Sequence, residues 1–197
     1  MITTILFDFF DVIRDDGLAR WLRKNGLTKT GDVLAITDAN DRGELTPAEL
    51  FRRLGELTGE TADAVEYELE HNNNLNQPLV EYIRDQLRGT YKVGLVSNSK
   101  SDYIRNEIRT YELESLFDAF IISSEVGAIK PQPEIFHIAL EQLHSQPTET
   151  IFIDDNPIYV DAANQLGIHG IVYTDFLELK HALETQLVRV TSEGGAR

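Results

Sequence analysis

The hydrophobic positions of this chain follow two different rhythms. Short apolar runs, rich in β-branched and aromatic residues, stand at the start of the chain and recur after residue 90, each bounded by polar or glycine-containing segments. Runs of this length and composition predict buried β-strands. We expect five strands, at residues 2–7, 91–98, 119–123, 150–154 and 169–173.

Around and between the later strands, apolar residues recur at helical spacing instead. This spacing predicts helices at residues 79–88, 101–112, 133–144, 158–166 and 176–188. Strands that alternate with helices are typical of parallel βαβ units, whose helices cover both faces of the sheet. The pattern therefore predicts an α/β fold with a doubly wound parallel sheet.

One long stretch near the start of the chain is helical without strands. Its segment TPAELFRRLGELTG has Thr46 as a helix N-cap, Pro47 at the first helical position and Gly59 as a stop. An asparagine-rich segment, HNNNLNQP, ends this stretch and predicts a hinge. We expect a small helical cap at residues 15–77, an α/β core at 1–14 and 78–188, and a flexible tail at 189–197.

The composition narrows the range of partners. The 197 residues include 33 acidic and 18 basic side chains, for a formal charge of −15, and no cysteine. An acidic protein repels nucleic acids and anionic membranes, so we expect neither as a partner. The lack of cysteine excludes disulfides, thiolate metal sites and cysteine nucleophiles. Because no apolar run could span a bilayer and no leader opens the chain, we expect a cytoplasmic protein.

Polar residues follow four of the predicted strands, at the carboxyl ends where open α/β sheets bind ligands. They are Asp8, Ser97 with Asn98, Lys130, and Asp154 with Asp155. Converging carboxylates are stable beside one another when a hard cation lies among them, and oxygen ligands suit Mg²⁺. A lysine and a hydroxyl beside that cation would bind a phosphoryl group, which Asp8 could attack in line. Each residue alone is common in turns and caps, so the prediction depends on their order.

This ordered set resembles the haloacid dehalogenase-like (HAD) hydrolase superfamily, over most of the chain. The matching motifs are LFDFFDVI with Asp8 as the nucleophile, VGLVSNS with Ser97, VGAIKPQPEIF with Lys130, and FIDDNP with the metal-binding Asp154 and Asp155. The segment RGELTPAELFRRLGE is similar to the family's helical cap between motifs one and two. The resemblance implies a Mg²⁺-dependent phosphatase for a small phosphorylated metabolite, acting through an aspartyl-phosphate. It also implies that Ser97, Lys130 and Asn98 bind the phosphoryl group.

The first motif departs from the family pattern at Phe10. The family usually has a second aspartate two residues after the nucleophile, which protonates the leaving oxygen and then activates water. Phe10 can do neither, although its backbone carbonyl could still bind the metal. Adjacent side chains of an extended chain point opposite ways, so Asp11 is not simply a shifted acid. Loss of a positioned acid typically lowers the rate by about 10²–10⁴-fold.

Three functions therefore remain open for this site. One is a phosphatase, slow or atypical, with a cap residue or a substrate hydroxyl supplying the proton. The second is a non-catalytic relative that binds a phosphorylated ligand. The third is a haloacid dehalogenase, favoured by an aromatic residue at position 10 and opposed by the pair Asp154–Asp155.

Other kinds of site fit the sequence less well. A receiver domain carries similar groups in a different order along the chain, and a serine hydrolase would need a G-x-S-x-G elbow. The segment DANDRGELTPAE, residues 38–49, has calcium-loop spacing, but Arg42 stands where an oxygen ligand is required, so we expect a helix–loop–helix corner. The five histidines lack zinc-site spacing. The candidates for anion contacts from the cap are Arg14, Arg42, Arg52 and Arg53, which are otherwise surface charges.

Overall fold

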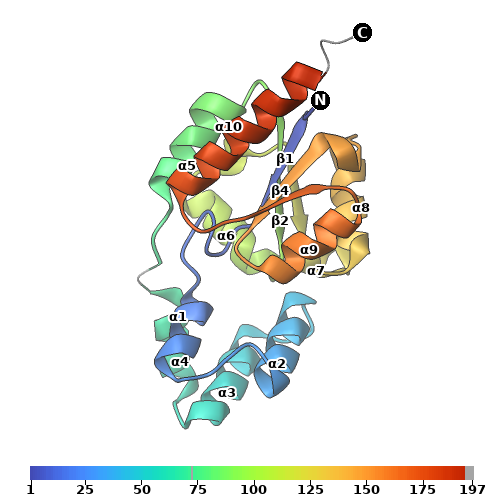
Figure 1. The fold of residues 1–197 in the computed structure, drawn as a ribbon. Coiled ribbons are helices and arrows are strands. Elements are labelled where there is room, and N and C mark those ends of the chain that lie inside the picture. Colours follow the sequence, from blue (N-terminus) through green and yellow to red (C-terminus); the bar gives the residue numbers. More distant parts are fainter. Residues whose placement is uncertain (72, 194–197) are drawn as a thin grey trace.

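The computed structural model describes residues 1–71 and 73–193, and its core is a five-stranded parallel sheet (Figure 1). The strand order is β3-β2-β1-β4-β5. The strands are β1 (Thr4–Phe7), β2 (Lys92–Ser97), β3 (Ala119–Ile122), β4 (Thr150–Asp154) and β5 (His169–Val172). The doubly wound α/β fold predicted from the sequence is confirmed.

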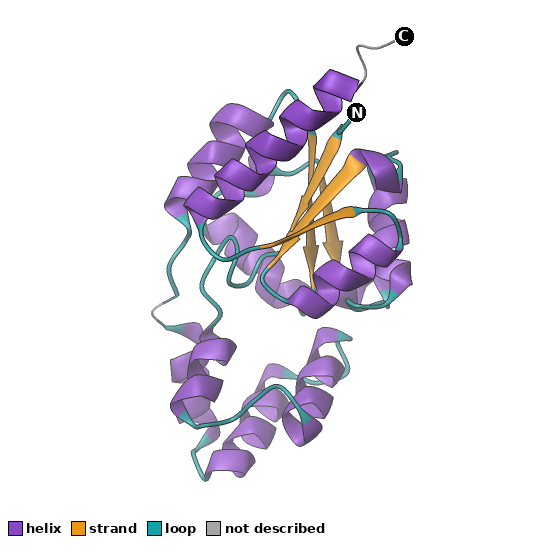
Figure 2. Ribbon diagram, in the orientation of Figure 1, coloured by secondary structure: helices purple, strands orange, loops and turns teal. Residues whose placement is uncertain are grey.

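Helices cover both faces of this sheet (Figure 2). In β1, Ile5 and Phe7 point into one apolar cluster and Leu6 points into the other. The first cluster includes residues of α5 (Gln77–Tyr82), α6 (Ser101–Thr110) and α10 (Phe176–Glu193), and the second those of α8 (Pro133–Gln142) and α9 (Pro157–Gln165). Because successive side chains of a strand alternate between faces, an uninterrupted apolar strand needs cover on both.

Short helices complete the core. They are the π-helix Ile83–Leu87, which continues α5, the 3₁₀-helices Glu114–Leu116 and Pro147–Glu149, and α7 (Ser123–Val126). The last helix, expected to end at residue 188, continues to Glu193, while residues 194–197 of the expected tail lie outside the described residues. No helix in the described part of the chain combines the length and apolarity that a membrane span requires.

Four helices, which we call the cap, form a separate body below the sheet in Figure 1, within the segment 15–77 for which a helical cap is predicted. They are α1 (Gly17–Lys24), α2 (Gly31–Asp41), α3 (Pro47–Thr58) and α4 (Ala62–Glu70). Their own apolar cluster is centred on Trp21 and Leu54, which are fully buried. Helix α3 begins as predicted, because the Thr46 hydroxyl accepts a hydrogen bond of 3.2 Å from the backbone amide of Glu49.

The segment with calcium-loop spacing has a different structure. Its first residues, from Asp38 to Asp41, belong to α2, and the guanidinium of Arg42 forms an ion pair of 2.7 Å with Glu44. A positively charged side chain thus takes the position at which calcium would need an oxygen ligand. The segment is a helix–loop–helix corner.

The two chain segments that join the cap to the core are hydrogen-bonded to each other. The amide of Asp15 donates to the carbonyl of Asn74 at 3.0 Å, and the amide of Asn76 donates to that of Ile13 at 2.8 Å. Beside them, a β-carbon on Gly17 would lie 2.0 Å from the carbonyl oxygen of Leu69, so only glycine lets α1 start this close to the end of α4. The paired segments thus hold the cap over the strand ends.

Candidate functional site

The central position of β1 brings the predicted site residues together. The chain leaves β1 towards β2 on one side and reaches β4 on the other, which places a ligand-binding crevice at its carboxyl end. Asp8 follows β1 directly, and its amide donates to the carbonyl of Ile153 at 2.9 Å, next to Asp154. Ser97 is the last residue of β2. Three positions far apart in the sequence therefore meet at one edge.

Lys130 reaches this edge from the loop after α7. Its Nζ lies 2.7 Å from Oδ1 of Asp8 and 2.6 Å from Oδ2 of Asp154, and the side chain is almost fully buried. Asn98 fixes the loop, because its Nδ2 donates to the carbonyl of Lys130 at 2.9 Å and its Oδ1 accepts from the amide of Lys130 at 2.8 Å. The amide group of Asn98, predicted to bind the phosphoryl group, is used here to position the lysine.

The three aspartates form a cluster with the geometry of a cation site. Carboxylate oxygens of Asp8, Asp154 and Asp155 lie within 4.8 Å of one another. Burial raises the pKa of Asp8 well above its ordinary value, and nearby Asp154 adds to this against the lowering effect of Lys130. Partial burial, with the charges of Asp154 and Asp11, raises the pKa of Asp155 to about 6. A cluster in which carboxylate charge is this unfavourable fits a hard cation such as Mg²⁺.

The ammonium of Lys130 is the positive charge that partly offsets these three carboxylates. Burial by itself lowers the pKa of Lys130, but the charges of Asp154 and Asp8 outweigh it and raise the pKa above its ordinary value. Lys130 therefore stays protonated at neutral pH. Three carboxylates against one ammonium leave an excess of negative charge, which a divalent cation would offset.

Ser97 has an unsatisfied hydroxyl at the same edge. Its side chain is fully buried, and among the described residues no partner hydrogen-bonds its Oγ. A buried polar group without a partner costs about 1–3 kcal/mol, so such groups call for an explanation. A phosphoryl oxygen bound beside Lys130 would provide the missing partner.

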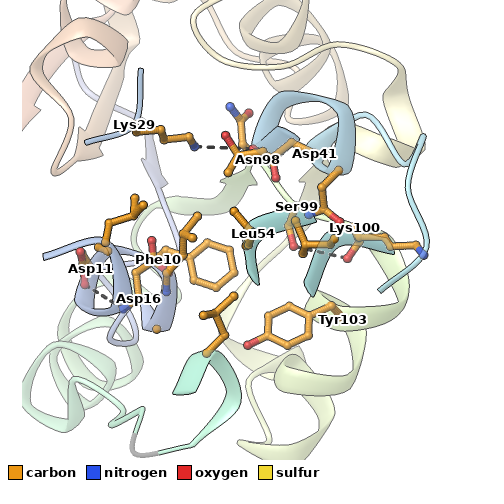
Figure 3. A pocket seen from close by; sticks show the side chains of 18 of the residues that line it. Phe10, Asp11, Asp16, Lys29, Asp41, Leu54, Asn98, Ser99, Lys100 and Tyr103 are labelled. Atoms are coloured by element: carbon orange, nitrogen blue, oxygen red, sulfur yellow. Dashed lines mark hydrogen bonds and ion pairs between the residues drawn. The ribbon is translucent and has the colours of Figure 1, made fainter. Parts of the chain in front are cut away.

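A cavity of about 310 Å³ lies between the strand ends and the cap (Figure 3), and Ser97 is not among the residues that line it. Asp8, Lys130 and Asp155 line it from the core. Phe10 also lines it, and its ring stacks on that of Tyr103 with the ring centres 6.2 Å apart. The position two residues after Asp8 therefore presents an aromatic face to the cavity.

Asp11 lines the cavity too, but its carboxylate is held by the turn. Oδ1 of Asp11 accepts a hydrogen bond of 2.8 Å from the backbone amide of Asp16. The backbone of Asp11 is left-handed, with φ of 54°, a conformation that glycine adopts most readily and that aspartate tolerates better than most residues. The prediction that Asp11 is not a shifted catalytic acid agrees with this anchored position.

The cap contributes charged residues that the sequence analysis did not single out. Nζ of Lys29 lies 3.8 Å from Oδ2 of Asp41, and both residues line the cavity (Figure 3). Burial raises the pKa of Asp41 to about 7, although Lys29 opposes this. The ring of Tyr159 lies 5.2 Å from Nζ of Lys130 and also lines the cavity. No sequence motif marks these residues, and Lys29 and Asp41 reach the cavity only through the docking of the cap on the core.

The arginines proposed as anion contacts are engaged elsewhere. Arg14 is buried and pairs with Glu107 at 2.5 Å, so it is not a surface charge. The other three candidates each pair with a nearby glutamate: Arg42 with Glu44, Arg52 with Glu56, and Arg53 with Glu49. From the cap, it is Lys29 that brings a cation to the cavity.

Comparison with known proteins gives a consistent set of relatives. The family model described as haloacid dehalogenase-like hydrolase matches residues 5–173. The D-ribitol-5-phosphate phosphatase of Bacteroides thetaiotaomicron is 29% identical over 186 residues, covering 85% of this chain and 89% of that protein.

Solved structures agree on the fold. A HAD-like hydrolase from Porphyromonas gingivalis matches with a TM-score of 0.71 and 25% identity, over 96% of this chain and 98% of that one. A HAD family enzyme from Bacteroides thetaiotaomicron, solved with magnesium and inorganic phosphate, matches with a TM-score of 0.70 and 23% identity, over 91% of this chain and 99% of that one.

Proposed function

Because this chain belongs to the haloacid dehalogenase-like hydrolases, we propose that it is a Mg²⁺-dependent phosphatase of small phosphomonoesters that acts through an aspartyl-phosphate at Asp8. One observation carries the proposal. The carboxylates of Asp8, Asp154 and Asp155 cluster within 4.8 Å, and the ammonium of Lys130 lies between two of them. That arrangement combines a nucleophile, a cation site and a phosphate-binding cation in one place.

The residues divide the chemistry among them. Asp8, Asp154, Asp155 and the backbone carbonyl of Phe10 would hold Mg²⁺, which supplies positive charge that offsets the charge of the phosphoryl oxygens. Lys130 donates a charged hydrogen bond to a phosphoryl oxygen, and the free hydroxyl of Ser97 donates a second. Both interactions strengthen as charge develops on these oxygens in the transition state.

Two covalent steps follow from this placement. A carboxylate oxygen of Asp8 bonds to phosphorus while the bond from phosphorus to the ester oxygen breaks, and the leaving group departs with the electron pair. Water then attacks phosphorus in the aspartyl-phosphate, releases inorganic phosphate and restores Asp8. Because Phe10 offers neither a proton nor a base, both steps lack the usual assistance at that position.

The same site fits two alternative functions, a dehalogenase and a non-catalytic phosphate-binding protein, less well. A dehalogenase would not need the acidic cluster that Asp154 and Asp155 complete with Asp8. A non-catalytic phosphate-binding protein would use Lys130 and Ser97 without turnover, and the apolar Phe10 is the feature that favours it. The phosphatase names of relatives such as the D-ribitol-5-phosphate phosphatase favour a catalyst.

The direct test is hydrolysis of a panel of phosphomonoesters, including p-nitrophenyl phosphate and sugar and polyol phosphates, with Mg²⁺ or with EDTA. We expect phosphate release with Mg²⁺, its loss with EDTA, and its loss in Asp8→Asn. Asp63→Asn, a matched change at an exposed residue of α4, should retain activity.

A trap for the nucleophile separates the catalytic and binding alternatives. Only a reactive Asp8 should form an adduct with BeF₃⁻ in the presence of Mg²⁺, which can be followed by ¹⁹F NMR. Phosphate binding without turnover and without this adduct would support the non-catalytic alternative instead.

A further inference from the structure

Part of the lining of the cavity is apolar. We define this apolar wall by six residues: Phe10 and Tyr103 from the core, and Leu18, Leu22, Leu50 and Leu54 from α1 and α3 of the cap. In Figure 3, the rings of Phe10 and Tyr103 lie next to each other, with Leu54 close by. The wall begins two residues from the nucleophile Asp8, so a group attached to the bound phosphoryl group would contact it.

The aromatic part of the wall is held rigidly. The rings of Phe10 and Tyr103 are inclined by 20°, and Phe9 packs edge-on against Phe10 with ring centres 5.1 Å apart. The hydroxyl of Tyr103 accepts a hydrogen bond of 3.1 Å from Nη2 of Arg14, which is itself buried. Burial raises the pKa of Tyr103 to about 12, so this phenol is a weak acid at neutral pH. Tyr103 therefore offers the cavity a fixed ring.

Polar groups also line the cavity, and some of them interact with each other. Lys29 faces Asp41, and Asp11 accepts a hydrogen bond from the backbone amide of Asp16. The lining has more carboxylates than ammonium groups, so it does not favour a substrate whose leaving group carries a negative charge. An apolar leaving group would instead gain free energy by covering the wall and removing its apolar surface from water.

The chemistry of the first step leads to the same class of substrate. When Asp8 displaces the leaving group, an alkoxide needs a proton as it departs, and Phe10 has none to give. A phenol has a pKa of about 10, well below that of an aliphatic alcohol, so an aryloxide can leave without a catalytic acid. The released aryloxide then takes its proton from water.

From the wall and the missing acid together, we propose that the substrates are aryl phosphate monoesters, with Phe10, Tyr103 and the leucines of the apolar wall determining this specificity. This inference rests on the proposed phosphatase function. It predicts a preference for aryl esters over polyol phosphates. The acidic residues of the cavity alone would favour the opposite, because carboxylates form hydrogen bonds with polyol hydroxyls.

The kinetic test compares phenyl phosphate with propyl phosphate and ribitol 5-phosphate, all with Mg²⁺. We expect kcat/KM for phenyl phosphate to be at least about 10²-fold higher than for either other ester. Across substituted phenyl phosphates, kcat/KM should rise steeply with the acidity of the phenol. A higher kcat/KM for ribitol 5-phosphate would overturn the inference and leave the phosphatase proposal intact.

A binding test needs no turnover. Calorimetry with Mg²⁺ should show benzylphosphonate binding about ten-fold more tightly than 2-hydroxyethylphosphonate, and Leu50→Gln or Leu18→Gln should remove this difference while inorganic phosphate still binds. The control is Leu57→Gln, at an exposed position of the same helix α3 as Leu50, which should leave the difference unchanged.

The outcomes separate the two proposals. Equal binding of the two phosphonates would overturn the aryl specificity even if the enzyme is active. Failure to hydrolyse any ester and to form the BeF₃⁻ adduct would instead contradict the proposed phosphatase, and the phosphonate measurement would still decide whether the wall selects an aromatic ligand.

Discussion

Nζ of Lys130 lies 2.6 Å from Oδ2 of Asp154 and 2.7 Å from Oδ1 of Asp8, so that one buried ammonium joins the ends of β4 and β1. Separating two buried carboxylates from their common partner would leave two uncompensated charges. Removing one member of a buried ion pair typically costs about 3–5 kcal/mol. The lysine is thus important for the folded protein, apart from the phosphate binding that we propose for it.

We predict that Lys130→Met lowers the free energy of unfolding by about 3–5 kcal/mol in EDTA. Added Mg²⁺ should restore more stability to this variant than it adds to the wild type, since the cation would neutralise the freed carboxylates. Denaturant unfolding with and without Mg²⁺ measures both effects.

Lys180→Met is the control for this prediction. Its ammonium lies 3.9 Å from Glu184 in an exposed ion pair, so its loss should change stability by no more than about 1 kcal/mol. A similar loss in both variants would contradict the role assigned to Lys130.

Ser97 and Ser123 form a matched pair of buried serines. Ser97→Ala removes a hydroxyl that has no partner among the described residues, so stability should not fall, while KM for the phosphate ester should rise about ten-fold or more.

Ser123→Ala removes a hydroxyl that donates to the carbonyl of Asp41 at 2.5 Å and accepts from the amide of Ser99 at 2.9 Å. It should cost about 1–3 kcal/mol of stability. Thermal unfolding and steady-state kinetics distinguish the two. A stability loss in Ser97→Ala would indicate a structural partner for its hydroxyl.

Phe10→Asp should supply the acid that the first motif lacks. We predict that kcat for alkyl phosphates rises by at least about ten-fold, because a carboxyl group at this position can protonate the leaving alkoxide. Phe10→Leu is the control, since it changes the size of the side chain without providing a proton, and its kcat for alkyl phosphates should stay low. If Phe10→Asp brings no gain, another group supplies the proton in the wild type.

The stability of the folded protein should depend on pH through the buried carboxyl group of Asp41. Burial raises its pKa in the folded protein from an ordinary value of 3.8 to about 7, so the folded state binds this proton more tightly than the unfolded state. Stability should therefore fall as the pH rises from about 4 through about 7, by at most about 4 kcal/mol from this residue. Asp41→Asn should be more stable than the wild type at pH 8 and should lose less stability across this range.

The control for Asp41 removes one negative charge from the same helix. Asp32→Asn, at an exposed position of α2, accounts for the general effect of charge in an acidic protein. Equal changes in the two variants, measured by urea unfolding at several pH values, would show that the burial of Asp41 is not the cause.

The sequence by itself determined the architecture of the core. Strand runs such as residues 5–7 are apolar at every position, and only a sheet covered on both faces accommodates such runs. Alternation of strands and helices then requires parallel strands, whose carboxyl ends share one edge. For that reason the convergence of Asp8, Lys130, Asp154 and Asp155 could be predicted without coordinates. The helix N-cap at Thr46 could also be predicted from the sequence, because a cap depends on a few neighbouring residues.

Only the tertiary structure decided what faces the site from the cap. Lys29 and Asp41 lie in or beside helices whose sequence pattern shows only which side packs within the cap, and the docking of the cap on the core depends on contacts between distant segments. The surroundings of Arg14 could not be predicted for the same reason. The sequence suggested a surface charge, and in the fold Arg14 is buried and contacts Glu107 and Tyr103. A charged residue's partner is set by long-range geometry, which local patterns of polarity do not encode.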